Sequence, residues 1–192
     1  MTKRFQEYIS ARAELSREEL ETILACSVTK KLRKHQYLLQ EGDVWRSNAF
    51  VCSGCVRVYS VDNTGVEHIM RFAIEDWWAG DRESYTTGQP SKFNIDALED
   101  SELILWAKAD FEKLLNDIPG LKKFSDDLLA KSHNTSVNRI HVALTSNAEE
   151  RYKDFIKKYP NIASRVPLHM IASYLGITPV TLSRIRSQAA KK

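Results

Sequence analysis

The chain has 192 residues, of which 43% are hydrophobic, enough for one good core and a small second domain. Its net charge of +3 is uneven: residues 151–192 carry nine Lys or Arg against one acid, Asp154, whereas the remainder has 19 basic residues against 24 acids. No segment has the ~20 apolar residues of a membrane span or the pattern of a signal peptide, so we expect a soluble, cytoplasmic protein with no membrane partner.

The first half of the chain predicts a short helix followed by many short strands. Ser16 and Glu19 have the spacing of a capping box, which opens a helix through Leu20 and Leu24. From residue 28 to 107, segments of period-two alternation are separated by turn signals. The predicted strands are 36–39, 49–52, 56–61, 66–73, 91–98 and 103–107. Their regular spacing indicates an antiparallel sandwich or barrel.

Helices follow the strands. We expect Asp110 to cap a helical turn over 111–115, and Pro119 to begin a long helix that runs to about Leu144. The apolar positions of this long helix are Leu121, Phe124, Leu128 and Leu129. Such a stripe can pack on its own domain or on a second copy of the chain, and its position between the β domain and the C-terminal helices favours dimerisation.

A further helix, Ala148 to Tyr159, is expected to stop at Pro160, and a loop then leads to two short helices within residues 168–187. The apolar residues of these two helices are spaced to meet in one core: Ile171, Leu175, Ile177, Leu182 and Ile185. Ala172 permits a close helix crossing, and Gly176 suits the positive φ at a helix end. Thr178 and Pro179 fit the N-cap and first position of the second helix.

This pattern predicts a helix-turn-helix that binds double-stranded DNA, and the basic C-terminal tail supports that interpretation. The candidate DNA-binding residues are Thr178, Pro179, Thr181, Ser183, Arg184 and Arg186. A structural or protein-binding helical module is the alternative, and strongly salt-dependent binding to duplex DNA would distinguish the two.

The order of a β domain, a long helix and a C-terminal helix-turn-helix resembles the Crp/Fnr family of bacterial transcription regulators over nearly the full chain. Three segments carry the resemblance: 41–58, with its Gly-Asp turn and glycine hairpin, 77–81 and 171–186. The resemblance implies an α+β fold with an N-terminal antiparallel β-roll like the cyclic-nucleotide-binding jelly roll (1–118), a central dimerisation helix (119–145) and a C-terminal winged helix-turn-helix (146–192). It also implies a homodimer, a small-molecule effector in the β-roll, and contact with RNA polymerase.

The phosphate-binding cassette departs from the family pattern. In members that bind cyclic nucleotides, the cassette ends with an arginine followed by a small hydroxyl residue, because a guanidinium holds the phosphate bidentately. Here those positions are Ser91 and Lys92, so we expect an effector other than a cyclic nucleotide, or none. In the alternative, Lys92 and Arg82 replace the arginine. The candidate ligand residues are Gly80, Asp81, Arg82, Ser91 and Lys92.

The recognition helix departs as well. Where close relatives present an arginine and a glutamate to base edges, this chain has Pro179 and Val180. Arg184 keeps a family arginine position and is the best candidate for a guanine contact, worth about 1–3 kcal/mol of discrimination. The preferred operator should therefore differ from that of the cAMP receptor.

The remaining chemistry-bearing residues fit no enzyme. We find no nucleophile–histidine–acid arrangement, no Walker motif and no metal-ligand spacing, and therefore expect no catalytic and no metal site. Cys52 and Cys55 are interpreted as structural, with a redox-responsive regulator as the alternative. We expect the four tryptophans to lie in the core and rim of the β-roll.

Overall fold

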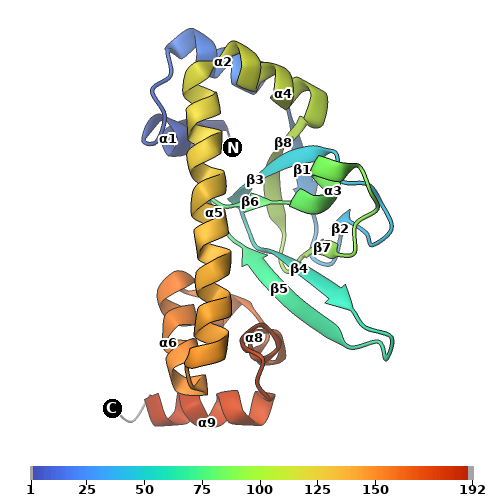
Figure 1. Cartoon of the computed structure of the whole chain (residues 1–192), viewed down its shortest axis with the longest axis vertical. Coiled ribbons are helices and arrows are strands. Elements are labelled where there is room, and N and C mark those ends of the chain that lie inside the picture. The colour runs from blue at the N-terminus through green and yellow to red at the C-terminus, as the bar shows by residue number, and fades with distance from the viewer. Residues whose placement is uncertain (1, 190–192) are drawn as a thin grey trace. The chain divides into compact units, whose positions relative to one another are not determined.

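A computed structural model describes residues 2–189, which form two compact units (Figure 1). Unit 1 comprises residues 2–61 and 70–129, and unit 2 comprises 62–69 and 130–189. The helices are α1 Thr2–Ser10, α2 Arg17–Ala25, α3 Arg82–Thr87, α4 Lys108–Asp117, α5 Pro119–Thr145, α6 Ala148–Lys158, α7 Ile162–Arg165, α8 Leu168–Leu175 and α9 Pro179–Ala189. The strands are β1 Ser27–Leu32, β2 Tyr37–Leu39, β3 Ser47–Ser53, β4 Val56–Val61, β5 Glu67–Ala73, β6 Trp78–Ala79, β7 Asn94–Ala97 and β8 Ser101–Ala107.

Unit 1 contains the predicted β-roll. Two four-stranded sheets have the orders β1-β8-β3-β6 and β2-β7-β4-β5. In the first, antiparallel pairing places Val28 opposite Leu105 and Phe50 opposite Ile104. In the second, Val58 lies opposite Ile95. Apolar residues from both sheets share one core, which confirms the antiparallel β fold expected from the strand spacing.

The predicted strands match β2, β3, β4, β5, β7 and β8 within a few residues at each end. The sequence did not single out β1, β6 or α3. β1 is largely exposed and carries Lys30 and Lys31, so its apolar alternation is weak. β6 has two residues, too few to show any period.

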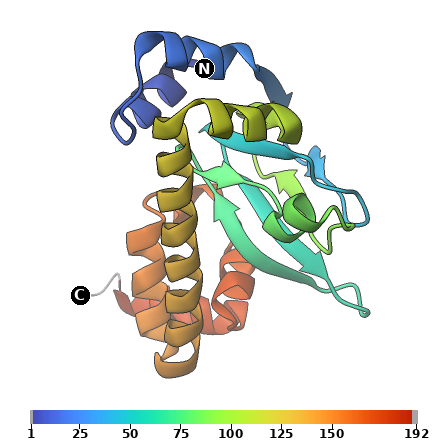
Figure 2. The ribbon, with the colours of Figure 1, turned by 45° about the horizontal axis from the view of Figure 1, so that its top comes forward.

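A second core lies at one end of unit 1, where α1 and α2 (blue) gather with α4 and the start of α5 (olive) in Figure 2. The capping box of α2 is confirmed, since Ser16 Oγ accepts from the Glu19 N–H at 3.1 Å and Glu19 Oε2 accepts from the Ser16 N–H at 2.7 Å. The prediction that Asp110 caps α4 is wrong. α4 begins directly after β8, with Ala107 at the N-cap, so Asp110 falls inside the first turn.

The long helix α5 starts at Pro119, as predicted, but its first apolar residues do not face outward. Leu121 is fully buried and Phe124 is 5% exposed, and both belong to the second core of unit 1. This half of the predicted apolar stripe therefore packs on its own domain. None of the helices within residues 2–189 is long and apolar enough to cross a membrane.

Unit 2 contains α6 to α9 and the end of α5, and its core includes Phe155, Tyr159, Ile171 and Leu182. Residues 62–69 group with this unit, where Ser173 Oγ on α8 accepts from the Ile69 N–H at 3.0 Å. The expected wing is not found, because no strand occurs between residues 130 and 189. The nine residues from 159 to 167 instead hold the single turn α7, which leaves too little chain for a β-hairpin.

Candidate functional site

The turn between α8 and α9 has the geometry that the sequence predicted. Gly176 adopts φ 65° and ψ 39°, and its N–H donates back to the carbonyls of Ala172 and Ser173. The Ile177 N–H also donates to the Ala172 carbonyl at 3.1 Å. These hydrogen bonds end α8 at a C-cap residue in the left-handed conformation, which glycine adopts without strain. Ala172 is 1% exposed, as expected at a close helix crossing.

The start of α9 is capped by a side chain. Thr178 Oγ1 accepts from the Thr181 N–H at 3.1 Å and lies 2.9 Å from Thr181 Oγ1. Pro179 occupies the first helical position, where its missing N–H leaves no bond unmade. Since the two threonine hydroxyls bond to each other, one of them donates its proton within the protein.

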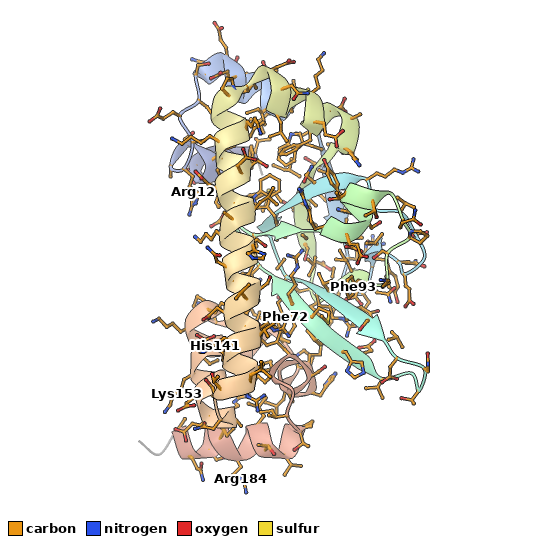
Figure 3. All side chains as sticks on the ribbon, in the orientation of Figure 1. Arg12, Phe72, Phe93, His141, Lys153 and Arg184 are labelled. Atoms are coloured by element: carbon orange, nitrogen blue, oxygen red, sulfur yellow. The ribbon has the colours of Figure 1, made fainter. Side chains whose placement is uncertain are left out.

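The outer face of α9 follows from its buried face. Leu182 and Ile185 are buried, and residues two positions away from them lie on roughly the opposite side of the helix. That opposite face holds Val180, Ser183, Arg184 and Ser187, all exposed. Figure 3 shows Arg184 on the outer side of α9.

The candidate DNA-binding residues chosen from the sequence do not include two members of this face. Val180 is 79% exposed, an unusual environment for a large apolar residue, and Ser187 lies two turns further along. Counting back two residues from the predicted core position at Leu182 would have found Val180. Among the predicted contacts, Thr178, Pro179, Ser183, Arg184 and Arg186 are exposed and Thr181 is half-buried. The basic residues Lys191 and Lys192 lie outside the described residues.

The cassette in unit 1 is held together by its own side chains. Asp81 caps α3, since its Oδ1 accepts from the N–H groups of Glu83 at 2.9 Å and Ser84 at 3.3 Å. Its Oδ2 accepts from Ser91 Oγ at 2.7 Å. Asp81 and Ser91 are both buried, so these two predicted residues do come together, but they bond to each other.

The other predicted cassette residues lie differently. Lys92 is exposed and forms an ion pair with Glu83 at 3.6 Å, and Arg82 is also exposed. Gly80 has φ +150°, and a Cβ there would overlap the indole of Trp45. Trp45 therefore occupies the space directly above the cassette glycine.

Two residues of the cassette were missed from the sequence. Trp45 packs in the β-roll core together with Tyr85, and Arg71 Nη2 donates to the Gly80 carbonyl at 2.7 Å. Trp45 lies 35 residues before Gly80 and Arg71 nine residues before it, and no local motif indicates that either reaches Gly80. The β-roll core is accordingly lined by large aromatic side chains at the cassette.

The cysteines of the Cys52-x-x-Cys55 pair are buried, whereas Cys26 is exposed. Burial raises the pKa of the Cys52 thiol to about 11, so the reactive thiolate is disfavoured at neutral pH. Within residues 2–189, no group of three or more His, Cys, Asp or Glu side chains is arranged to hold a metal ion. These observations support a structural role for the two buried cysteines.

A buried ion pair lies on the sheet that also carries β7. Arg57 Nε donates to Asp96 Oδ1 at 2.7 Å and Nη2 donates to Oδ2 at 3.0 Å, with side chains 7% and 5% exposed. The guanidinium carbon lies 4.0 Å from the centre of the Tyr59 ring. Because Val56 and Val58 face the β-roll core, the intervening Arg57 belongs to the opposite face of the sheet.

Comparison with known proteins agrees with this architecture. Residues 29–117 match the cyclic nucleotide-binding domain family. The anaerobic regulatory protein of Pasteurella multocida (strain Pm70) is 27% identical over 173 residues, which are 84% of this chain and 63% of that protein, so this chain spans less than two thirds of that relative's length.

Among solved structures, FixK2 from Bradyrhizobium japonicum has a TM-score of 0.76 at 20% identity, over 86% of this chain and 85% of that one. A Crp/Fnr-family protein from Eubacterium rectale has a TM-score of 0.68 at 16% identity, over 92% of this chain and 85% of that one. At these identities the solved structures establish the fold, namely a β-roll, a long helix and C-terminal helices.

Proposed function

We propose that this chain is a sequence-specific DNA-binding regulator of transcription of the Crp/Fnr type. Its match to the cyclic nucleotide-binding domain family, its similarity to an anaerobic regulatory protein and its fold support the proposal. The observation that carries the proposal is the outer face of α9, where Val180 and Arg184 are exposed on a helix that is capped and held by α8. A helix of this kind, at the end of a helix-turn-helix, is the element that enters the major groove.

The chemistry of this face suggests how it reads DNA. Arg184 can donate two hydrogen bonds to a guanine, and the Val180 side chain can contact a thymine methyl group. Ser183 on this face and Arg186 beside it suit phosphate contacts, which position the helix without specifying sequence. α9 contains two arginines and no acidic residue, so its field favours a polyanion.

The test begins with selection of a preferred duplex from a random library, followed by fluorescence anisotropy at several salt concentrations. We expect affinity to fall steeply as salt rises, because bound phosphates release counterions. Arg184→Ala should reduce the preference for the selected duplex by about 5-fold to 150-fold, the equivalent of 1–3 kcal/mol.

Arg17→Ala is the matched control, since Arg17 is an exposed arginine of unit 1 that pairs with Glu21 on α2. We expect it to leave both affinity and preference unchanged. Equal sequence preference in Arg184→Ala and the wild type would overturn the assignment of Arg184, and absence of salt-dependent duplex binding would overturn the function itself.

We also propose that the chain forms a dimer. The proposed interface is a face of α5 that differs from the apolar stripe predicted at the start of this helix. Val137, Ile140 and Leu144 are 51%, 62% and 81% exposed and recur at the i, i+3, i+7 spacing of a coiled-coil seam. Sedimentation should show a dimer for the wild type and a monomer for Ile140→Asp. Asn138→Asp places the same charge two residues away, about 200° round the helix, and should remain dimeric.

The contacts at the cassette favour an effector other than a cyclic nucleotide. Trp45 covers Gly80, and Asp81 and Ser91 bond to each other, so the groups that would face a cyclic phosphate have partners within the protein. Calorimetric titration with cAMP should give no saturable binding in the micromolar range. Saturable micromolar binding of cAMP would instead support the alternative hypothesis, in which Lys92 and Arg82 replace the missing arginine.

A further inference from the structure

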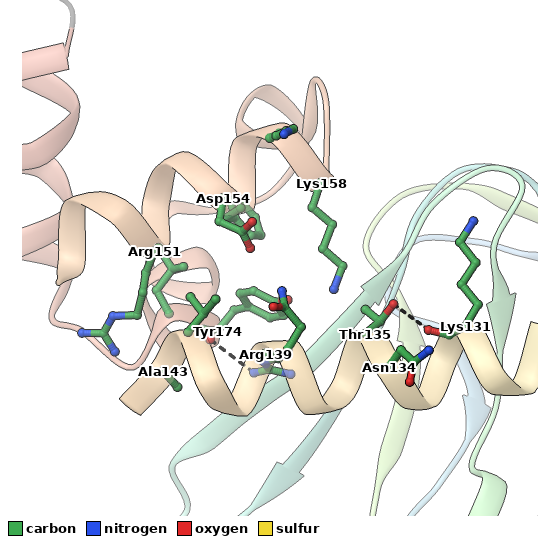
Figure 4. Close-up of a pocket in the computed structure, with 14 residues that line it drawn as sticks. Lys131, Asn134, Thr135, Arg139, Ala143, Arg151, Asp154, Lys158 and Tyr174 are labelled. Carbon is green, nitrogen blue, oxygen red and sulfur yellow. Dashed lines mark hydrogen bonds between the residues drawn. The ribbon is translucent and has the colours of Figure 1, made fainter. Parts of the chain in front are cut away.

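Unit 2 contains a groove that the proposed DNA contacts do not use. It lies between the C-terminal half of α5 and α6, with Tyr174 and Leu175 of α8 at its base, and has a volume of about 1010 Å³. Figure 4 shows Asp154 and Lys158 extending from α6 toward α5, and Thr135 and Arg139 on the facing helix. Every residue that lines the groove belongs to unit 2.

The groove is strongly basic. Its lining cations come from both walls, and the single lining acid is Asp154, which leaves a formal charge of +4. The lining cations are Lys131, Arg139, Arg151, Lys157 and Lys158. Like charges gathered in a concave surface repel one another and concentrate the positive potential there, so an anion between the walls would be stabilised.

The fold holds one of these cations in place and leaves a buried N–H of another without an acceptor. The Arg139 guanidinium carbon lies 4.1 Å from the centre of the Tyr174 ring, and its Nη2 donates to the Tyr174 carbonyl at 3.3 Å. Arg151 Nε is buried and has no hydrogen-bond partner among the described residues, and a Cβ on Gly176 would lie 3.8 Å from Arg151 Nη1. A buried guanidinium N–H without an acceptor is costly, and an anion would supply one.

The groove does not coincide with either proposed interface. Thr135 and Val142 line it, and each precedes by two residues a member of the exposed apolar stripe, Val137 or Leu144. Two residues correspond to about 200° of helix rotation, so the groove and the stripe occupy opposite sides of α5. The volume of about 1010 Å³ is that of a small-molecule site.

We infer that this groove binds an oligophosphate, that is, two or three linked phosphate groups, either inorganic or at the end of a nucleotide. The charge of +4 matches the three or four negative charges of such a chain, and the cations on both walls can hold successive phosphates. The inference goes beyond the proposed DNA binding, because the site can be filled and measured without DNA.

The test uses the full chain at low ionic strength and calorimetric titration with inorganic tripolyphosphate, ATP and orthophosphate. We expect one tripolyphosphate per chain, and orthophosphate weaker by about tenfold or more, because it meets fewer of the cations. Equal affinity for ATP and tripolyphosphate would indicate that the phosphate chain suffices, whereas tighter ATP binding would indicate that the nucleoside also contacts the groove. Both results support the inference.

Two variants are compared with the wild type. The double variant Lys131→Gln/Lys158→Gln removes one cation from each wall of the groove, and the single variant Lys153→Gln is the control. Lys153 lies on α6 but pairs with Glu149 at 2.8 Å and does not line the groove. The double variant should lose about tenfold or more in tripolyphosphate affinity, while the control should bind as the wild type does. Without ligand, the double variant should melt at the wild-type temperature or higher, since its groove cations repel one another less.

Three results would overturn the inference. They are the absence of saturable tripolyphosphate binding below about 1 mM, equal binding by the wild type and the double variant, and a double variant that loses duplex DNA binding while its tripolyphosphate affinity is unchanged. The last result would make the groove part of the DNA interface.

Discussion

The buried ion pair between Arg57 and Asp96 allows a quantitative prediction about the β-roll. The variant Asp96→Leu lacks the carboxylate, while the Arg57 guanidinium, 7% exposed, stays buried. Removing one partner of such a pair costs about 3–5 kcal/mol, because the remaining charge has lost its solvation without compensation. For a chain of this length, that loss corresponds to a fall in Tm of about 6–20 °C.

The matched variant removes both charges. Arg57→Met together with Asp96→Leu replaces the pair by apolar side chains of similar size and should unfold within about 1 kcal/mol of the wild type. Urea unfolding followed by circular dichroism gives the free energies of the wild type, both single variants and the double variant. A cost below about 1 kcal/mol for Asp96→Leu, or a double variant less stable than that single variant, would refute the reasoning.

Three smaller predictions concern individual side chains. Thr178→Ala should destabilise unit 2 by about 1 kcal/mol through loss of the α9 cap, measured by urea unfolding, whereas Thr178→Ser should retain the cap. Burial raises the pKa of Cys52 to about 11, so its contribution to stability is complete below about pH 8.5 and is lost as pH rises toward 11; at pH 8, mass spectrometry should find Cys26 alkylated before Cys52. Hydrogen bonds from Thr64 and His68 lower the pKa of Asp62, so the protection factors of the amides in residues 62–69, that is, the intrinsic exchange rate at each pH divided by the measured rate, should fall as pH drops below about 4.

The features predicted correctly from the sequence are those fixed by neighbours in the chain. Gly176, Thr178 and the Ser16–Glu19 box each act over three or four residues, and local spacing identifies them. The cassette could not be read in the same way. Its structure depends on Trp45 covering Gly80 and on Arg71 donating to the Gly80 carbonyl, and such tertiary contacts leave no periodic pattern in the sequence. The sequence also did not show which apolar residues of α5 are buried, since only the structure distinguishes the packed start of α5 from its exposed end.

The positive charge of the C-terminal segment also needs a different interpretation from the one that composition suggests. From the nine Lys and Arg of residues 151–192, the sequence attributes a single basic footprint to DNA. In the structure, Arg184 and Arg186 lie exposed on α9, whereas Arg151, Lys157 and Lys158 line the groove beside α5. Because counterion release counts only cations that meet phosphates, the salt dependence of DNA binding should follow α9 rather than the total charge. The groove cations do not enter that count, so binding of an oligophosphate there can be measured separately from the binding of DNA.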